Sequence, residues 1–228
     1  MKNVDIDKKP LVSIVVITYN SAKYVLETLE SCKNQTYSHI ELIISDDAST
    51  DDTIEICEEW LSKNKDRFIR TAIVKAERNG GISTNCNRGV NHAEGEWIKL
   101  IAGDDLILGN GIENIIANLK PEMSIVDSLV YTCDENSENI DEYIIERRDF
   151  FSQNYDGQLK ALAKNLGGRR LISTVGVFYR KNLFLQVGGY DTRFRMLEDT
   201  PFWFKVLQSG HKFYFVNKHS VVYRLHGS

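Results

Sequence analysis

Two pairs of adjacent aspartates are the residues whose type and spacing most directly suggest chemistry in this sequence. One pair, Asp46–Asp47, opens the stretch DDASTDDT, and the other, Asp104–Asp105, lies in LIAGDDLIL. Adjacent carboxylates at a buried position are costly unless a cation or a hydrogen-bond donor compensates them. A hard divalent cation, Mg²⁺ or Mn²⁺, takes oxygen ligands and keeps room for substrate phosphates. An acidic pair can therefore hold an anionic diphosphate through a bridging metal ion.

A third pair in the first stretch, Asp51–Asp52, has a sufficient structural explanation. Ser49 and Asp52 have the S-x-x-D spacing of a capping box. Acidic side chains in a first helical turn also meet the positive end of the helix dipole. We therefore expect Asp51–Asp52 to begin a helix, which leaves the other two pairs as candidates for binding.

The first half of the chain alternates strand-like and helix-like patterns. The β-branched run Leu11–Thr18 is typical of a central parallel strand buried on both faces. Such alternation predicts an open α/β sheet, whose ligands bind at the carboxyl ends of the strands. Both candidate pairs directly follow an expected strand and so fall at that edge. The expected strands are Leu11–Thr18, Ile40–Ser45, Phe68–Val74 and Trp97–Ala102, and the expected helices start at Asn20 or Ser21, after Asp52, and at Ile82.

The second half has a looser pattern after Leu119. Residues 134–157 are acidic and aromatic and predict a loop or a short excursion. A helix is expected from Pro201, with Gly210 past its end. Strands are expected at residues 175–180, 212–216 and 220–225, the last two closing a mixed part of the sheet. The predicted fold class is α/β, with an open mixed, mainly parallel sheet flanked by helices and a Rossmann-like nucleotide-binding half.

Composition limits the other classes of protein. The 228 residues carry a net charge of −4, which argues against a general binder of nucleic acid or anionic membranes. No apolar run approaches the roughly 18–20 residues of a membrane span, and the polar start MKNVDIDKKP does not resemble a signal peptide. The scattered cysteines predict reduced thiols in a cytoplasmic protein, without a zinc site; they are Cys32, Cys57, Cys86 and Cys133.

Asp47 needs a different partner from Asp104–Asp105, because it follows a different strand. A carboxylate only accepts hydrogen bonds, and a nucleobase offers N–H donors such as the imide of uracil. Tyr19 follows the first strand and offers a flat face for a base to stack on, although a core or interface position would explain it equally. No dinucleotide-binding G-x-G-x-x-G follows the first strand, and no P-loop is present. The two glycines in RNGGIST, residues 78–84, would let the backbone approach phosphates.

Six stretches in this order resemble the motif series of the family 2 nucleotide-sugar glycosyltransferases. They are VSIVVITYN, ISDDASTDDT, RNGGISTNCNRGVNHAEGEWIKLIAGDD, VGGYD, LEDTPFWFKV and YRLHGS, and the resemblance runs from about Pro10 to Ser228. It implies the A-type glycosyltransferase fold and a reaction that inverts the anomeric centre. It also implies a nucleotide-sugar donor, a UDP-sugar above others, and Mn²⁺ or Mg²⁺ as the cofactor.

The resemblance assigns roles residue by residue. Asp105 matches the direct metal ligand, with Asp104 nearer the sugar or ribose, although G-D-D here replaces a strict D-x-D. His226 matches a position that in some relatives helps bind the metal or diphosphate. Asp199 matches the general base, with Glu198 beside it. The donor-binding set comprises Ile17, Thr18, Tyr19, Asp46, Asp47, Asn79, Gly81 and Asp104, in which Tyr19 stacks on the base and Asp47 binds it.

Structural explanations remain open for several of these residues. Asp199 or Thr200 would also cap the helix after it, and His226 would also suit a surface or core position. The cations Arg78, Arg193 and Arg195 are candidates for phosphate or acceptor contacts and equally for solvated positions. A sugar-phosphate nucleotidyltransferase is disfavoured, because TYNSAKY lacks the glycine- and arginine-rich loop that would hold a nucleoside triphosphate.

The sequence thus predicts an inverting, metal-dependent glycosyltransferase acting in bacterial-type surface polysaccharide or glycoconjugate synthesis. Its acceptor would be a carbohydrate or lipid-linked hydroxyl, at the cytoplasmic face of the membrane or free in the cytoplasm. A non-catalytic nucleotide-sugar-binding module, or an inactive truncated domain, is the alternative. We expect a tail at residues 1–9 and one domain at 10–228, with a nucleotide-binding half at 10–106, an acceptor-binding half at 107–228 and a longer natural chain.

Overall fold

The computed structural model describes residues 9–143, 148–166 and 171–226. The expected tail, residues 1–9, lies almost wholly outside the described residues. The strands are β1 Val12–Thr18, β2 Ile40–Asp46, β3 Arg70–Lys75, β4 Trp97–Ala102, β5 Leu106–Ile107, β6 Ile125–Cys133, β7 Asp141–Glu142, β8 Phe178–Arg180 and β9 Tyr214–Arg224. The helices are α1 Val25–Lys33, α2 Thr53–Asn64, α3 Ile82–His92, α4 Gly111–Ile116, α5 Arg148–Ser152, α6 Tyr155–Lys164, α7 Lys181–Gln186 and α8 Asp199–Gln208, with 3₁₀ turns η1 Lys65–Arg67 and η2 Thr174–Gly176.

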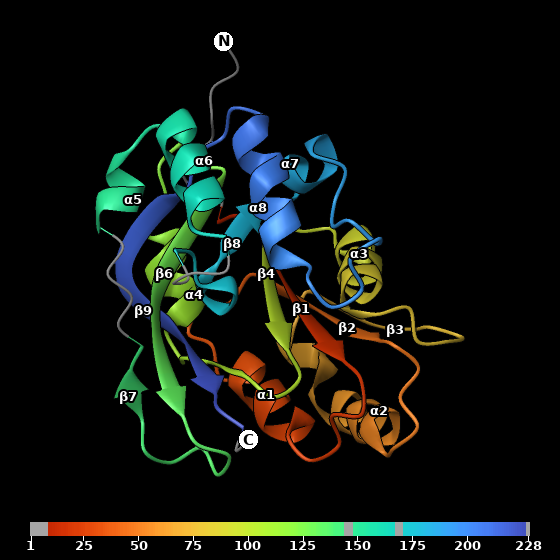
Figure 1. The fold of residues 1–228 in the computed structure, drawn as a ribbon. Helices are drawn as coiled ribbons and strands as arrows, with labels where there is room; N and C mark the ends of the chain where they lie inside the picture. Colours follow the sequence, from red (N-terminus) through yellow and green to blue (C-terminus); the bar gives the residue numbers. More distant parts are fainter. Residues whose placement is uncertain (1–8, 144–147, 167–170, 227–228) are drawn as a thin grey trace.

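One mixed sheet runs through both halves of the chain, in the order β3-β2-β1-β4-β8-β6-β9-β5, with β7 paired to β6 (Figure 1). The first four strands are parallel, as the alternating pattern predicts. Strand β8 is antiparallel to both β4 and β6, and β9 runs parallel to β6. The predicted fold class is confirmed, and the carboxyl ends of β1, β2, β4, β6 and β9 lie at the lower side of the view in Figure 1.

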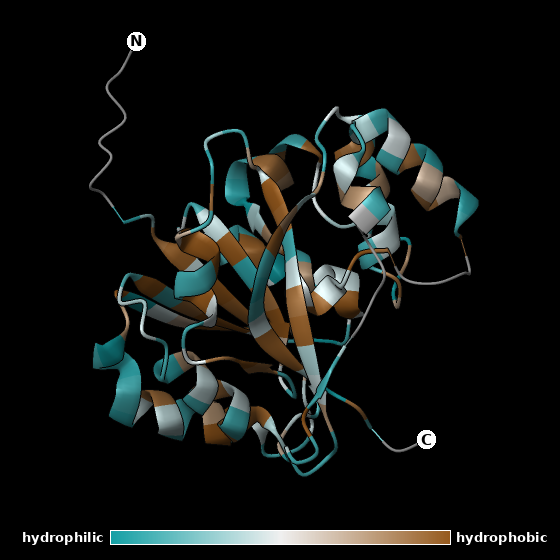
Figure 2. Ribbon diagram, turned by 90° about the vertical axis from the view of Figure 1, so that its left-hand side faces the viewer, coloured by the Kyte–Doolittle hydropathy of each residue, from teal (hydrophilic) through white to brown (hydrophobic). Residues whose placement is uncertain are grey.

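Both faces of the sheet are buried at β1, because successive residues of this strand point to opposite faces and all seven are buried. Val12, Ile14 and Val16 pack with α1 and α2 in one core. Val15 and Ile17 pack with α3 and α8 in the other. Figure 2 shows mostly brown, apolar strands in the middle of the molecule and helices of mixed brown and teal around them. This explains why β1 is almost unbroken in hydrophobic character.

The second half departs most from the sequence prediction. The nine-residue strand β6 was not expected, because its run IVDSLVYTC carries Asp127 and Ser128 in the middle. The two expected closing strands are one strand, β9, whose pairing with β6 shifts register near Leu129. The expected strand over 175–180 is the turn η2 followed by the short strand β8. The acidic excursion over 134–157 contains β7, helix α5 and the start of α6; residues 144–147 within it lie outside the described residues.

Two predicted helix starts are wrong in detail. Helix α1 begins at Val25, after a turn in which the carbonyl of Ser21 accepts hydrogen bonds from Tyr24 and Val25. The capping box before α2 does not form, because the Ser49 hydroxyl donates to Asp46 instead. Asp51 takes over at that helix start, accepting from the backbone N–H and the hydroxyl of Thr53.

The start of α8 also differs from the prediction. The helix begins at Asp199, so Pro201 is its third residue and not its first. The end is as expected, with Gly210 two residues past the last helical position at a φ of 84°. This left-handed conformation suits glycine, which has no Cβ to clash.

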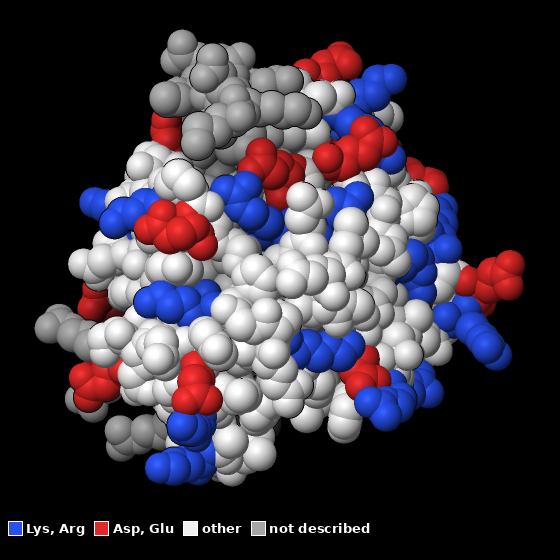
Figure 3. Space-filling view, turned by 90° about the horizontal axis from the view of Figure 1, so that it is seen from above, with Lys and Arg blue, Asp and Glu red and all other residues white. Residues whose placement is uncertain are grey.

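The surface and the cysteines agree with the composition. Figure 3 shows Lys and Arg interspersed with Asp and Glu on the face seen from the top of Figure 1, without one broad area of a single sign. All four cysteines are buried and unpaired. Among the described residues, no helix is long and apolar enough to cross a bilayer.

Candidate functional site

The parallel register brings the candidate acids to one edge of the sheet. Thr18, the last residue of β1, pairs with Asp46 of β2, and Ile17 pairs with Ala102 of β4. Since neighbouring strands lie 4.7–4.9 Å apart, the ends of β2 and β4 are roughly 10 Å apart across β1. Asp47 and Asp105, which follow these two strands, therefore belong to the same edge.

Asp46 is buried and has partners for both of its carboxylate oxygens. Oδ1 accepts hydrogen bonds from the hydroxyls of Thr18, at 2.7 Å, and Ser49, at 2.6 Å. Oδ2 accepts from the backbone N–H of Ser49, at 2.8 Å. These contacts join the ends of β1 and β2 to the loop before α2. In this arrangement Asp46 shapes the edge of the site.

Asp47 lies next to it and faces the loop before α3. Its Oδ2 accepts from the backbone N–H groups of Gly81, at 2.8 Å, and Gly80, at 3.1 Å. Arg88 of α3 forms an ion pair with Oδ1 at 3.1 Å. The carboxylate is buried and its charge is compensated by Arg88, which the sequence analysis missed. The structure thus brings Asp47 and the glycine loop together.

Gly81 and Asn79 connect this corner to the segment before α8. Gly81 has a φ of 87°, and a Cβ there would lie 2.8 Å from the carbonyl oxygen of Arg195. That carbonyl accepts a hydrogen bond from Ile82 N–H at 2.9 Å. The Arg195 guanidinium in turn donates to Oδ1 of Asn79 at 3.2 Å. The 79–82 loop therefore packs directly against Arg195, and only glycine fits at position 81 of this loop.

The residues at the end of β1 differ sharply in exposure. Ile17 and Thr18 are buried, and the carbonyl of Thr18 accepts hydrogen bonds from Asp47 N–H and the Asn85 side chain. Tyr19 is 50% exposed, which excludes the core position that was left open for it. Its ring is free to pack against a ligand at this edge.

The two residues of the second acidic pair, Asp104 and Asp105, differ in their exposure to solvent. Asp105 is 2% exposed, and its Oδ1 accepts from Arg224 N–H at 2.9 Å. No described residue donates a hydrogen bond to its Oδ2. Burial, together with the charge of Asp104, raises the pKa of Asp105 to about 7. Asp104 is more exposed, and its Oδ2 lies 2.7 Å from Nε2 of His226.

These groups fit a hard divalent cation. A buried carboxylate oxygen without a donor is the kind of group that a cation stabilises, and carboxylate oxygens are the ligands that hard cations prefer. The described residues contain no group of three or more His, Cys, Asp or Glu side chains placed to hold a metal by themselves. A metal here would thus take further ligands from a substrate or water, as Mg²⁺ commonly does.

Arg224 is the residue that holds this corner together. Its side chain is fully buried. Nε donates to the carbonyl of Asp104 at 2.7 Å, and the terminal nitrogens donate to Glu27 of α1 and to the 135–137 turn. The guanidinium also lies over the ring of Tyr24, at 4.6 Å. The available signal in the sequence was a lone arginine in the otherwise apolar strand pattern SVVYRL.

The predicted base residues lie at the start of α8. Oδ2 of Asp199 accepts from the hydroxyl of Thr174 at 2.7 Å, and Oδ1 accepts from Thr200 N–H at 2.6 Å. Asp199 is half-buried and is the first residue of its helix. Its carboxylate therefore lies at the positive end of the helix dipole. Glu198 is also half-buried, and its charge adds to the burial that raises the pKa of Cys86 in α3.

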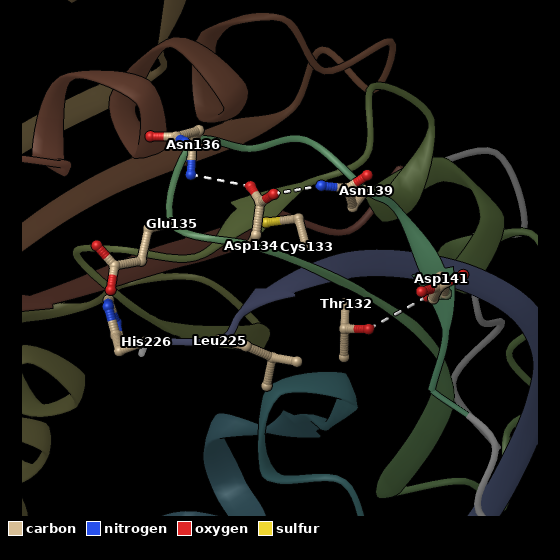
Figure 4. A pocket seen from close by; sticks show the side chains of 9 residues that line it. All are labelled: Thr132, Cys133, Asp134, Glu135, Asn136, Asn139, Asp141, Leu225 and His226. Atoms are coloured by element: carbon tan, nitrogen blue, oxygen red, sulfur yellow. Dashed lines mark hydrogen bonds between the residues drawn. The ribbon is translucent and has the colours of Figure 1, made fainter. Parts of the chain in front are cut away.

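A polar pocket of about 540 Å³ adjoins the His226 side of the site (Figure 4). In Figure 4 the side chains of His226 and Glu135 point toward one another. Asp134 is held by the amide of Asn139, at 2.6 Å, and by two backbone N–H groups of its own turn. The lining residues are Thr132, Cys133, Asp134, Glu135, Asn136, Asn139, Asp141, Leu225 and His226.

A sequence model described as "Glycosyl transferase family 2" matches residues 13–187, which is more than half of the chain. The chain is 33% identical to glycosyltransferase GlyG of Streptococcus pneumoniae over 135 residues, covering 59% of this chain and 44% of GlyG. It is 28% identical over 221 residues to the uncharacterized glycosyltransferase MJ1057 of Methanocaldococcus jannaschii, covering 95% and 71%. It is 31% identical over 137 residues to the chondroitin synthase of Escherichia coli, covering 60% and 19%.

Solved structures share the fold at low identity. TarS 1–349 of S. aureus in complex with UDP-GlcNAc superposes with a TM-score of 0.71 at 20% identity, over 96% of this chain and 59% of that one. The mannosyltransferase PcManGT of Pyrobaculum calidifontis, in complex with GDP-Man and Mn²⁺, gives 0.69 at 21% identity, over 95% and 57%. The chain thus spans less than two thirds of these solved structures and under half of GlyG.

Proposed function

The chain belongs to glycosyl transferase family 2, and from this premise we propose that it transfers a sugar from a nucleotide-sugar to an acceptor hydroxyl with inversion of the anomeric centre. The observation that carries the proposal is that Asp47 and Asp105 lie at one edge of the sheet. Asp47 and Asp105 follow β2 and β4, the two strands on either side of β1, and Arg195, which contacts the Gly81 loop, lies four residues before Asp199. Base recognition, diphosphate binding and proton removal are thereby assigned to separate, adjacent groups.

The nucleoside part of the donor would bind at the ends of β1 and β2. The exposed ring of Tyr19 offers a stacking face, and Asp47 offers carboxylate oxygens to the base N–H. Ile17 and Thr18 would form the floor, while Asn79 and Gly81 close the side toward α3. Asp46 would act indirectly by holding the loop at residues 46–53. A UDP-sugar is the favoured donor, because uracil presents an imide N–H to Asp47.

The diphosphate would bind beside Asp104 and Asp105 with Mn²⁺ or Mg²⁺. When bound, the metal supplies positive charge that stabilises the departing nucleoside diphosphate. Asp105, with its buried Oδ2, would be a direct ligand. His226 would join it at the exposed side, where it already lies against Asp104. Arg224 fixes both aspartates through its hydrogen bonds to the Asp104 carbonyl and the Asp105 carboxylate.

Asp199 would take the proton of the attacking acceptor hydroxyl as the glycosidic bond breaks. A single displacement inverts the configuration, so no enzyme nucleophile is needed. Glu198, the residue before it, would act through its charge and not touch the acceptor.

The acceptor would approach from the second half of the chain. The pocket beside His226 is lined by carboxylate, amide and hydroxyl groups, which suit the hydroxyls of a carbohydrate. A role in surface polysaccharide or glycoconjugate synthesis is supported by the similarity to a chondroitin synthase. The four unpaired cysteines support a reducing, cytoplasmic setting.

The proposal is tested with a thermal-shift screen of UDP, GDP, UDP-sugars and GDP-mannose, each with and without Mn²⁺, followed by an assay of nucleoside diphosphate release. We expect one nucleotide class to stabilise the protein with metal present and its sugar to be turned over. Binding without turnover across an acceptor panel would favour a non-catalytic nucleotide-sugar-binding module. No binding of any nucleotide would refute the proposal.

A further inference from the structure

A buried pair of opposite charges lies beneath the site and has no part in the proposed chemistry. Lys99 of β4 and Asp127 of β6 are both fully buried. Burial lowers the pKa of Lys99 to about 7, although the charges of Asp105 and Asp127 oppose that shift. Burying such groups is costly unless they are hydrogen-bonded. The hydrogen bonds of Lys99 and Asp127 should therefore indicate their structural role.

Both residues bond to the same short segment, the turn η2 and the residue before it. The Lys99 ammonium donates to the carbonyl of Val175. Oδ2 of Asp127 accepts from Ser173 N–H at 2.9 Å. The Ser128 hydroxyl donates to the carbonyl of Gly176 at 2.9 Å. Three buried side chains from two strands thus hold the backbone of Ser173, Val175 and Gly176, on both sides of Thr174.

Position 176 is adapted to this contact. A Cβ on Gly176 would lie 2.6 Å from Oδ1 of Asp127 and 3.0 Å from the carbonyl of Ser128, both in fully buried residues. Any side chain there would push the turn away from the two strands. The turn is therefore held against β6 as closely as a backbone allows.

The one residue of this turn that reaches toward the site is Thr174, whose hydroxyl donates to Oδ2 of Asp199 at 2.7 Å. The other hydrogen bond that a described residue donates to this carboxylate comes from Thr200, the next residue, which moves with it. Upstream of Asp199 the chain is exposed, with Met196 84% and Leu197 47% accessible. Among the described residues, Thr174 thus provides the hydrogen bond that fixes Asp199 to a different element.

We propose that Thr174 is a positioning residue for Asp199, and that the buried Lys99–Asp127 pair and Ser128 hold the η2 turn so that its hydroxyl fixes the carboxylate. The inference rests on the proposed role of Asp199 as the base. A misplacement of a base by a fraction of an ångström lowers the rate of proton transfer without affecting how the donor is bound. Lys99 and Asp127 thereby connect the sheet, through the η2 turn and Thr174, to the carboxylate of Asp199, which follows an exposed loop.

The test uses Thr174→Val, which keeps the size of the side chain and removes the hydroxyl, and Thr174→Ser, which keeps the hydroxyl. Thr71→Val, a half-buried threonine of edge strand β3, is the matched control. We expect kcat for nucleoside diphosphate release to fall about tenfold in Thr174→Val, the value of one hydrogen bond. The donor Kd should be unchanged, and Thr174→Ser and the control should stay within about threefold of the wild type.

A double-mutant cycle separates this inference from the proposed function. In an Asp199→Asn background, Thr174→Val should cause no further loss, because its effect passes through Asp199. If Asp199→Asn is impaired but Thr174→Val equals the wild type, the positioning inference is overturned while the proposed base stands. If Asp199→Asn turns over normally, the assignment of the base fails first and the inference with it.

A structural readout does not depend on the choice of acceptor. In a crystal structure of Thr174→Val, we expect the Asp199 carboxylate to leave its wild-type position or to occupy more than one rotamer. An Asp199 side chain that keeps one conformation, superimposable on the wild type, would overturn the inference.

Discussion

The Nε atom of Arg224 donates a 2.7 Å hydrogen bond to the carbonyl oxygen of Asp104, which joins the last strand to the acidic turn across 120 positions of sequence. The backbone N–H of the same arginine donates to Asp105. The end of β9 therefore fixes both acids of the candidate metal site. This contact explains why the site needs the far end of the chain.

Replacing Arg224 by Met should destabilise the fold strongly. The change leaves Glu27, the Asp104 carbonyl and the 135–137 turn without their donor, at a cost of about 3 kcal/mol in the free energy of unfolding. Chemical denaturation measures it. Arg193→Met is the control, since that side chain is 84% exposed and its replacement should leave stability close to that of the wild type. Equal stability of both variants would refute the role given to Arg224.

Asp105→Ala should abolish the metal-dependent part of donor binding. The variant removes the buried oxygen that is proposed to meet the metal, so the gain in donor affinity on adding Mn²⁺ should fall at least about tenfold. Titration calorimetry with and without Mn²⁺ measures this gain. Asp66→Ala, an exposed acid of η1, is the control and should keep it. Retention of the full gain in Asp105→Ala would remove Asp105 from the metal site.

The stability of the metal-free protein should depend on pH through Asp105. Its pKa is raised from 3.8 to about 7, so the folded state binds this proton more tightly than the unfolded state does. The stabilisation is thus complete below about pH 4 and lost as the pH rises through 7. Asp105→Asn, which stays neutral, should gain stability relative to the wild type over this range. A difference between the two proteins that does not change with pH would contradict the burial of an uncompensated carboxylate.

Lys99 should give the opposite dependence at higher pH. Its pKa is lowered from 10.5 to about 7, so the folded state releases this proton more readily than the unfolded state. The free energy of unfolding should therefore rise between about pH 7 and pH 10.5 through this group. Lys99→Met should flatten that rise in denaturation curves recorded at several pH values. An unchanged slope in the variant would show that Lys99 keeps its charge in the fold.

Asp199→Asn should retain donor binding and lose transfer. The amide cannot accept the acceptor proton, so kcat should fall by about 10²–10⁴ while the donor Kd stays within about twofold. Product release and calorimetry measure the two quantities. Asp156→Asn, an exposed acid paired with Lys160 on α6, should change neither. Transfer at the wild-type rate in Asp199→Asn would exclude this residue as the base.

Local sequence patterns were sufficient for the parallel half of the sheet and for the family resemblance. Strand β4 has the predicted bounds, because all of its residues except Lys99 are apolar. The placement of Asp47 and Asp105 at one edge followed from the rule that parallel strands end together. Strand β6 escaped prediction, since its buried Asp127 and Ser128 serve the η2 turn and break the apolar pattern.

The sequence by itself determined the fold class, the family resemblance and the edge where the candidate acids lie, because periodicity and residue chemistry are local properties. Only the tertiary structure decided that Asp46 accepts hydrogen bonds from Thr18 and Ser49. It also decided that Asp104 contacts His226 while Asp105 is buried. The hydrogen bond from Thr174 to Asp199 likewise appears only in the structure. The reason is physical: a carboxylate's role depends on which donors surround it. Those donors, such as Arg224, come from parts of the chain that no local pattern connects.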